Sequence, residues 1–403
     1  MESPYSPKSA YSESSRHSVT STVLWDHDAF ETYQFSVLEF ALYNIWPGAN
    51  LNDIIIERLK GGGFNRIIGL TRKGNSRTNS ADVQYIVRIP RHDDARVDRD
   101  VATLEFLGRH TKISVPKVLT FDTTEDNELH FPYMIQDRIA GTDVLTGFPR
   151  LNHAKKLRFA RELGNVFRQI LAVRSHTAGS LVFSSEGNDI DIKAEFSVIP
   201  YGHDGFNLAV PYSSTKTTRQ TIRDLLLSNF QDQMAHIIKY HPSAYLKFGL
   251  FGQLCAMVWE LEERGLFHNV DYCLAHLDLA PRNILIDPTS TPKKPIISGV
   301  LDWDSAVFAP AFMACEPPLW VWGWLDGEDE DERTANDVPP TVEGRQLKKA
   351  FERAAGKDYM RFAYNPAYRL ARRLVRFAIQ HELQSNYDWG DVEVMLAEWK
   401  TVR

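Results

Sequence analysis

The 403-residue sequence contains little cysteine. Its three cysteines are Cys255, Cys273 and Cys315, and no two of them form a C-x-x-C pair. An odd number without such a pair argues against a disulfide framework and against a cysteine-based zinc site. The sequence also lacks an N-x-[ST] glycosylation site. Both absences favour a reducing, cytoplasmic compartment.

The sequence also lacks a long apolar run and an excess of positive charge. No stretch is long enough to span a bilayer, so we expect no membrane anchor. The formal net charge is −6, which argues against a nucleic-acid-binding protein, since such proteins usually carry a basic face. Hydrophobic residues make up 43% of the chain, enough for a globular protein with a large core.

The distribution of residue types predicts two lobes. Residues 1–22 are rich in serine and have no apolar segment, so we expect a disordered tail there. A mitochondrial transit peptide is the weaker alternative, because the segment has only one arginine. Short β-branched runs predict a β-rich lobe at 23–140, and long amphipathic stretches predict a larger helical lobe at 141–403. The expected fold class is α+β.

The segment HLDLAPRN (276–283) fits the pattern H-x-D-x-x-x-x-N. A loop with this spacing can place Asp278 toward an acceptor hydroxyl while Asn283 turns back toward a metal ion. Phosphoryl transfer from ATP needs such a carboxylate, and an amide oxygen suits Mg²⁺. Asp278 is therefore the candidate acid-base residue and Asn283 a candidate metal ligand. His276 is more typical of a structural hydrogen-bonding residue than of a catalyst.

A second acidic segment, GVLDWDSA (299–306), contains Asp302, which lies nineteen residues after Asn283. An apolar run predicts a strand that ends at Asp302, where a carboxylate could bridge a metal ion and phosphates. The alternative is an aspartate that caps a turn. Together with the first motif, the metal interpretation is favoured. Asp304 is a weaker candidate, which could orient its neighbours.

A glycine triplet at Gly61, Gly62 and Gly63 separates two predicted strands. Backbone N–H groups of such a turn can approach phosphates because no Cβ stands in the way. A plain hairpin explains the triplet equally well. The triplet precedes a further predicted strand, as the phosphate-covering turn of a kinase would.

Arg88 lies within the predicted strand YIVRIPR (85–91). A buried strand arginine is costly unless it is paired or faces a ligand. Arg88 could contact the α- and β-phosphates of ATP and be held by Asp100 or Glu105 of the following predicted helix. The alternative is a surface arginine on an edge strand.

Taken in order, these segments resemble the aminoglycoside phosphotransferase and choline kinase-like family, which has the bilobal protein-kinase fold. HLDLAPRNILID is similar to that family's catalytic loop, and GVLDWDSA is similar to its metal-binding segment. The likeness spans about 51–325, and the turn GGGFNR looks most like members from filamentous fungi. The D-F-G, H-R-D and A-P-E signatures of protein kinases are missing, which favours a small-molecule acceptor.

The resemblance implies a role for each matching residue. Asp278 stands where the family has its catalytic aspartate, and Asn283 and Asp302 stand where it has its metal ligands. The implied substrates and cofactor are ATP, Mg²⁺ and a small hydroxylated molecule. Leu277 replaces the glycine usual between His and Asp, which reduces the freedom of the loop backbone.

The resemblance also implies a nucleotide site in the N-terminal lobe. Arg88 stands where many members have lysine, and Asp100 stands where the helix usually has glutamate. The longer side chain of arginine would compensate for the shorter side chain of aspartate, so the distance between the strand and the helix would be preserved. The backbone between Asp137 and Ile139 would contact the adenine.

The leading hypothesis is therefore ATP- and Mg²⁺-dependent phosphorylation of a small-molecule hydroxyl. One alternative is a catalytically silent nucleotide-binding protein, supported by Leu277 and the Arg88–Asp100 exchange. Another is a related fold recruited to a different group transfer. The missing G-x-x-x-x-G-K-[ST] motif excludes a P-loop NTPase.

The acceptor pocket is expected in the helical lobe, but its occupant is not predicted. It could include the irregular segment at 180–220 and the tryptophans Trp320, Trp322 and Trp324, although such aromatics are more often core residues. The acidic run GEDEDER (327–333) predicts a solvated loop, or alternatively a region that attracts a cationic substrate.

Overall fold

The computed structural model describes residues 30–59, 64–74, 81–91, 96–184, 189–193, 221–240, 248–323, 331–379, 383 and 386–402. These residues form two compact units. Unit 1 contains the described residues up to Arg109 and also Ser114–Ala140, whereas unit 2 contains His110–Ile113 and the described residues from Gly141 onwards. Within these ranges, every helix is too short or too polar to cross a membrane.

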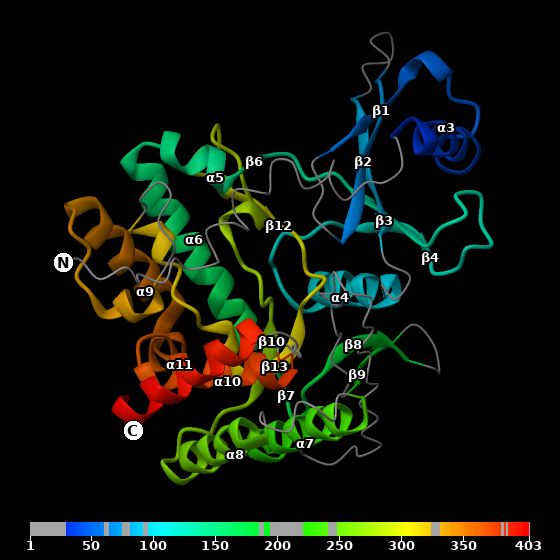
Figure 1. Ribbon diagram of the computed structural model, residues 1–403. Coiled ribbons are helices and arrows are strands. Elements are labelled where there is room, and N and C mark those ends of the chain that lie inside the picture. The colour runs from blue at the N-terminus through cyan, green and yellow to red at the C-terminus, as the bar shows by residue number, and fades with distance from the viewer. Residues whose placement is uncertain are drawn as a thin grey trace, which may run out of the picture. The chain divides into compact units, whose positions relative to one another are not determined.

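A five-stranded antiparallel sheet forms the centre of unit 1 (Figure 1). Its strand order is β1-β2-β3-β5-β4, so β3 lies in the middle. β-Branched residues favour these strands because they pack well on a pleated surface. The strands are β1 (Ile54–Arg58), β2 (Asn65–Arg72), β3 (Val83–Pro90), β4 (Val118–Asp122) and β5 (Tyr133–Asp137).

Four helical segments accompany this sheet: α3 (Phe30–Phe40), the π-helical turn η1 (Ala41–Ile45), the 3-10 turn η2 (Leu51–Asp53) and α4 (Val97–His110). Val37 and Phe40 share a buried apolar cluster with strand residues. Trp46 stacks on Tyr85 with ring centroids 5.7 Å apart. Burial of such side chains stabilises the unit by roughly 1.5–3 kcal/mol each.

Unit 2 is mainly helical. Its helices are α5 (Val144–Gly147), α6 (His153–Ala172), α7 (Ile222–Tyr240), α8 (Phe248–Glu263), α9 (Val342–Ala363), α10 (Pro366–Ile379) and α11 (Asn386–Val402). Helices α6 and α9 pack so closely that a Cβ on Gly164 would lie only 2.6 Å from the carbonyl oxygen of Phe351. Glycine is therefore needed at this crossing.

Small antiparallel sheets in unit 2 hold the loops that carry the candidate chemistry. One has the order β13-β10-β7, a second β12-β11-β6 and a third β8-β9. Their strands are β6 (Thr142–Asp143), β7 (Arg174–Ser175), β8 (Ser180–Phe183), β9 (Ile190–Lys193), β10 (Tyr272–Ala275), β11 (Ile284–Ile286), β12 (Ile297–Val300) and β13 (Val307–Pro310). The α+β composition agrees with the sequence prediction.

Two of the three candidate pocket tryptophans belong to the core. Trp320 is 9% exposed and Trp322 is 7% exposed. The Trp320 ring lies 5.8 Å from that of Phe159, and the Trp322 ring lies 5.6 Å from that of Phe351. Their role is packing, which was the favoured interpretation. Trp324 lies outside the described residues.

Candidate active site

Two buried strands hold the loop that carries Asp278. Strand β10 leads into the loop, and the 3-10 turn η5 (Pro281–Asn283) and β11 follow it. All four residues of β10 are buried, and β10 pairs on both sides, with β13 and β7. The loop is therefore fixed at both ends.

His276 connects this loop to the end of β12. Its Nε2 lies 2.9 Å from the carbonyl oxygen of Leu301, and its Nδ1 lies 3.3 Å from the backbone nitrogen of Asp278. A carbonyl can only accept, so Nε2 carries the proton and Nδ1 accepts from the Asp278 N–H. Burial lowers the pKa of His276 and favours this neutral form. These contacts support a structural role for His276.

Leu277 adopts the left-handed backbone conformation, with a φ of 61°. This is the position where the sequence resemblance leads us to expect glycine. A left-handed leucine costs roughly 1–2 kcal/mol, so the surrounding loop must hold it. The side chain therefore adds strain, yet the loop still adopts a conformation suited to glycine. Such strain often occurs at functional sites.

The carboxylate of Asp278 accepts hydrogen bonds from two neighbouring side chains. Arg282 Nη2 lies 2.6 Å from Oδ1 and 2.7 Å from Oδ2. Asn283 Nδ2 lies 2.9 Å from Oδ2. Each carboxylate oxygen can accept about two hydrogen bonds. Oδ1, with one donor, is therefore the better placed of the two to accept a hydroxyl proton.

The amide of Asn283 has a defined orientation. Its Nδ2 also donates to the Asp278 carbonyl oxygen at 2.8 Å, so both amide protons have acceptors. The nitrogen end faces Asp278, which makes Oδ1 the atom that a cation would meet. Asn283 is only 7% exposed, so neighbouring residues restrict this geometry.

Asp302 is brought to the same loop by backbone pairing. Ile284 pairs with Val300, and the N–H of Leu301 donates to the carbonyl oxygen of Asn283 at 2.7 Å. Asp302 follows directly, with a φ of 62° that turns the chain sharply. The structure thus places the two candidate metal ligands on adjacent segments.

The donor set fits Mg²⁺. No group of three or more His, Cys, Asp or Glu residues that could hold a metal occurs in the described part of the chain. Mg²⁺ usually binds through one or two carboxylates and completes its shell with water and substrate phosphates. One carboxylate from Asp302 and one amide oxygen from Asn283 match this requirement.

Unit 1 contains the candidate nucleotide residues. The strands β1 and β2 that flank the predicted turn pair antiparallel, but Gly61, Gly62 and Gly63 themselves lie outside the described residues. Arg88 lies in the central strand β3 and is 8% exposed. The alternative of a surface arginine on an edge strand is therefore wrong, because β3 pairs on both sides.

The other candidate nucleotide residues lie at the ends of elements. Asp100 lies in the first turn of α4, and its pairing with Arg88 stays a prediction. At the predicted hinge, the N–H of Asp137 donates to the carbonyl oxygen of Lys117 at 2.8 Å, so this donor is not available to adenine. Ile139 follows β5, and its contact with adenine stays a prediction.

Among the described side chains that donate to the Asp278 carboxylate, Arg282 is the one to which the sequence prediction assigned no role. The signal was present, because Arg282 lies four residues after Asp278, the spacing of a local ion pair. The pattern H-x-D-x-x-x-x-N fixes only the His, Asp and Asn positions, so it does not single out Arg282.

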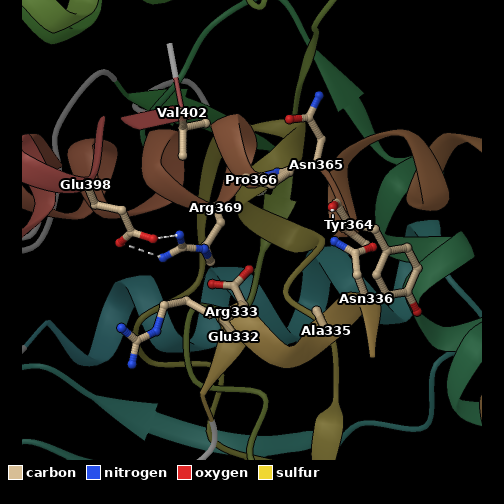
Figure 2. Close-up of a pocket in the computed structure, with 11 residues that line it drawn as sticks. Glu332, Arg333, Ala335, Asn336, Tyr364, Asn365, Pro366, Arg369, Glu398 and Val402 are labelled. Carbon is tan, nitrogen blue, oxygen red and sulfur yellow. Dashed lines mark hydrogen bonds and ion pairs between the residues drawn. The ribbon is translucent and has the colours of Figure 1, made fainter. Parts of the chain in front are cut away.

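A separate hollow of about 250 Å³ lies in unit 2 among η8 (Glu332–Asn336), α10 and α11 (Figure 2). Figure 2 shows the guanidinium of Arg369 facing the carboxylate of Glu398. Arg369 Nη1 donates to Glu398 Oε2 at 3.1 Å. Arg333 also lines it and pairs with Asp331 at 2.9 Å. Acids thus offset the cations of this hollow, and none of the predicted site residues lines it.

The sequence matches a known protein family. A family model described as the phosphotransferase enzyme family (APH) matches residues 72–313, more than half of the chain. The chain belongs to this family. The matched range includes Arg88, Asp278, Asn283 and Asp302.

Individual relatives are more distant. A subtelomeric hrmA-associated cluster protein of Aspergillus fumigatus is 22% identical over 406 residues, covering 84% of this chain and 76% of the relative. The altered inheritance of mitochondria protein 9 of Candida glabrata is 28% identical over 165 residues, covering 39% of this chain and 24% of that protein.

The fold is that of the aminoglycoside phosphotransferases. The ADP-bound structure of aminoglycoside phosphotransferase APH(2'')-Ib superposes with a TM-score of 0.51 at 13% identity, covering 89% of this chain and 95% of that chain. This confirms the predicted protein-kinase-like α+β fold, with a sheet-rich N-terminal region and a larger helical region.

Proposed function

We propose that this phosphotransferase-family protein transfers the γ-phosphoryl group of ATP to a hydroxyl of a small molecule. The observation that carries the proposal is the arrangement around Asp278. Its Oδ1 retains capacity to accept a hydroxyl proton, and the Asn283 amide is turned so that its oxygen can meet a cation. Family membership supports phosphoryl transfer as the reaction class.

In the proposed reaction, Asp278 orients the acceptor hydroxyl through Oδ1 and takes its proton. The hydroxyl oxygen bonds to the γ-phosphorus as the bond to the β-phosphate oxygen breaks, and ADP leaves. Mg²⁺, held by Asn283 Oδ1 and Asp302, would neutralise phosphate charge. His276 keeps the loop in position by bridging Asp278 and Leu301.

The nucleotide would be bound by unit 1 residues. Arg88 supplies a cation for the phosphates and Asp100 holds it, the glycines at 61–63 cover the phosphates, and Ile139 meets the adenine. The ADP in the structure of APH(2'')-Ib supports nucleotide binding.

The test follows phosphate from labelled ATP. The protein is incubated with [γ-³²P]ATP, MgCl₂ and pools of hydroxylated metabolites, and labelled products are separated and identified by mass. We expect a labelled phosphomonoester with the wild type and none with Asp278→Asn. Nucleotide binding without labelled product from any pool would instead support the silent nucleotide-binding protein, for which the strained Leu277 is the structural argument.

A further inference from the structure

The guanidinium of Arg282 lies against the candidate catalytic carboxylate. A single nitrogen, Nη2, makes both contacts with Asp278, at 2.6 and 2.7 Å. The Arg282 side chain is 57% exposed and that of Asp278 is 37% exposed. An ion pair this accessible to water contributes little to stability, so it keeps Arg282 near Asp278 but leaves it able to bind another group.

Most of the guanidinium remains available for a second acceptor. Arginine presents five N–H donors in a planar fork, which matches carboxylate and phosphate groups. Among the described residues, Arg282 bonds through Nη2 to Asp278 only. Nε and Nη1 can therefore bind another anion while the contact with Asp278 persists.

The acceptor must come close to this cation. A hydroxyl that bonds to Asp278 Oδ1 would lie about 2.7 Å from that oxygen, and Arg282 Nη2 lies 2.6 Å from the same oxygen. The hydroxyl therefore lies within about 5 Å of Nη2. An anionic group one or two bonds from the hydroxyl would reach the open side of the guanidinium.

We propose that Arg282 is a specificity-determining residue of the acceptor site, and that it binds a carboxylate or phosphate group carried by the acceptor beside its hydroxyl. The proposal rests on the proposed function in one respect, that Asp278 meets the hydroxyl. It deepens that function by naming the substrate class, a hydroxylated acid or phosphate rather than a polycation.

The described part of the acidic run does not favour a cationic acceptor. Asp331 Oδ1 accepts from Arg333 at 2.9 Å, and Glu332 pairs with the buried Arg372. These two acids are offset by cations of the chain itself. Residues 327–330 lie outside the described range.

The test measures protection of Arg282 in the wild-type protein. The chain is modified with phenylglyoxal, which reacts with accessible guanidinium groups, and each arginine is followed by peptide mass spectrometry. Separate arms contain sodium phosphate, sodium acetate or the non-hydrolysable nucleotide AMP-PNP with magnesium. Ionic strength is held constant with NaCl, because screening alone changes charged reactions. Arg150, an exposed arginine of η3 (Phe148–Arg150), is the internal control.

We expect phosphate or acetate to slow modification of Arg282 saturably, by about fivefold at the plateau for a contact worth about 1 kcal/mol, with Arg150 unchanged. The arm that protects identifies the anionic group. Equal effects on Arg282 and Arg150 would overturn the proposal. Protection by AMP-PNP with none by phosphate or acetate would also overturn it, because the anion would then be the nucleotide. The readout needs no turnover, so a missing kinase activity is detected separately by the labelled-ATP assay.

Discussion

Two of the arginine–carboxylate pairs in unit 2 have opposite character. The pair between Arg282 and Asp278 is open to water, with side chains 57% and 37% exposed. The pair between Arg372 and Glu332 is largely buried, with side chains 2% and 21% exposed. Arg372 also donates to the carbonyl oxygens of Phe362 and Phe312, at 3.1 and 3.3 Å. Burial lowers the pKa of Arg372 to about 10, which leaves it charged at neutral pH.

The difference in burial distinguishes a pair that a ligand can reach from a pair that stabilises the fold. A solvated pair contributes little to folding and its groups stay available to a substrate. A buried pair is committed, because removing one partner leaves an uncompensated charge in a medium that solvates it poorly. An arginine–carboxylate pair can therefore stay accessible to a ligand in one place and hold a segment in another.

The largest expected effect is on activity, at the open pair. Asp278→Asn removes the proton acceptor, and such groups contribute about 10²–10⁴-fold to a rate. Turnover should fall by that factor, whereas the free energy of unfolding should change by less than about 1 kcal/mol. Product formation and urea denaturation measure the two quantities. A comparable loss of stability would mean that the pair is structural after all.

The next effect is on stability, at the buried pair. Glu332→Gln should lower the free energy of unfolding by about 3–5 kcal/mol, because Arg372 keeps its buried charge. Glu343→Gln is the control, since Glu343 has a 41% exposed side chain that pairs with Lys156 at 3.1 Å. This change should cost less than about 1 kcal/mol. Equal losses in the two variants, measured by urea denaturation, would contradict the contrast.

His276 should make the free energy of unfolding depend on pH. Burial holds its pKa in the folded state below the ordinary value of 6.5, so the unfolded chain binds a proton first as the pH falls. The His276 contribution to stability is complete above about pH 6.5 and is lost below it, by at most about 1.4 kcal/mol per pH unit. His276→Gln should flatten this part of the plot of unfolding free energy against pH, measured by denaturation between about pH 5 and pH 8. A profile with the same slope in both proteins would exclude His276 as its source.

The smallest effect is expected from the cation of the open pair. Arg282→Gln should change the free energy of unfolding by less than about 1 kcal/mol, since the lost contact is solvated. Arg372→Gln should cost several times more, because it also leaves buried carbonyl oxygens and Glu332 without their donor. Parallel thermal and urea denaturation of the two variants measures the ratio, and similar costs would remove the distinction between the pairs.

Much of the fold was predictable because its signals are local. The β-branched runs around Ile56 and Val87 became strands β1 and β3, and the apolar positions Val97, Val101 and Leu104 form the buried face of α4. Side-chain period and turn residues encode such elements directly. The order of the strands in the sheet depends on distant contacts, which is why an edge position for Arg88 remained an open alternative.

The spacing of the candidate site residues can be read from the sequence, but their geometry cannot. The spacing between Asp278 and Asn283 indicated a loop, yet the amide orientation of Asn283 depends on two acceptors that only the folded loop brings together. The contact of Arg282 with Asp278 likewise depends on the conformation of η5. The sequence also could not show that Leu277 would adopt the left-handed conformation, because leucine disfavours it.

The most direct test of the central claim measures phosphate transfer and nucleotide binding in the same pair of proteins. Wild type and Asp278→Asn are compared for label transferred from [γ-³²P]ATP to hydroxylated metabolites and for ADP affinity in the presence of Mg²⁺. We expect equal ADP affinity in both proteins and a labelled phosphomonoester from the wild type alone. Label transfer that is unchanged in Asp278→Asn would contradict it.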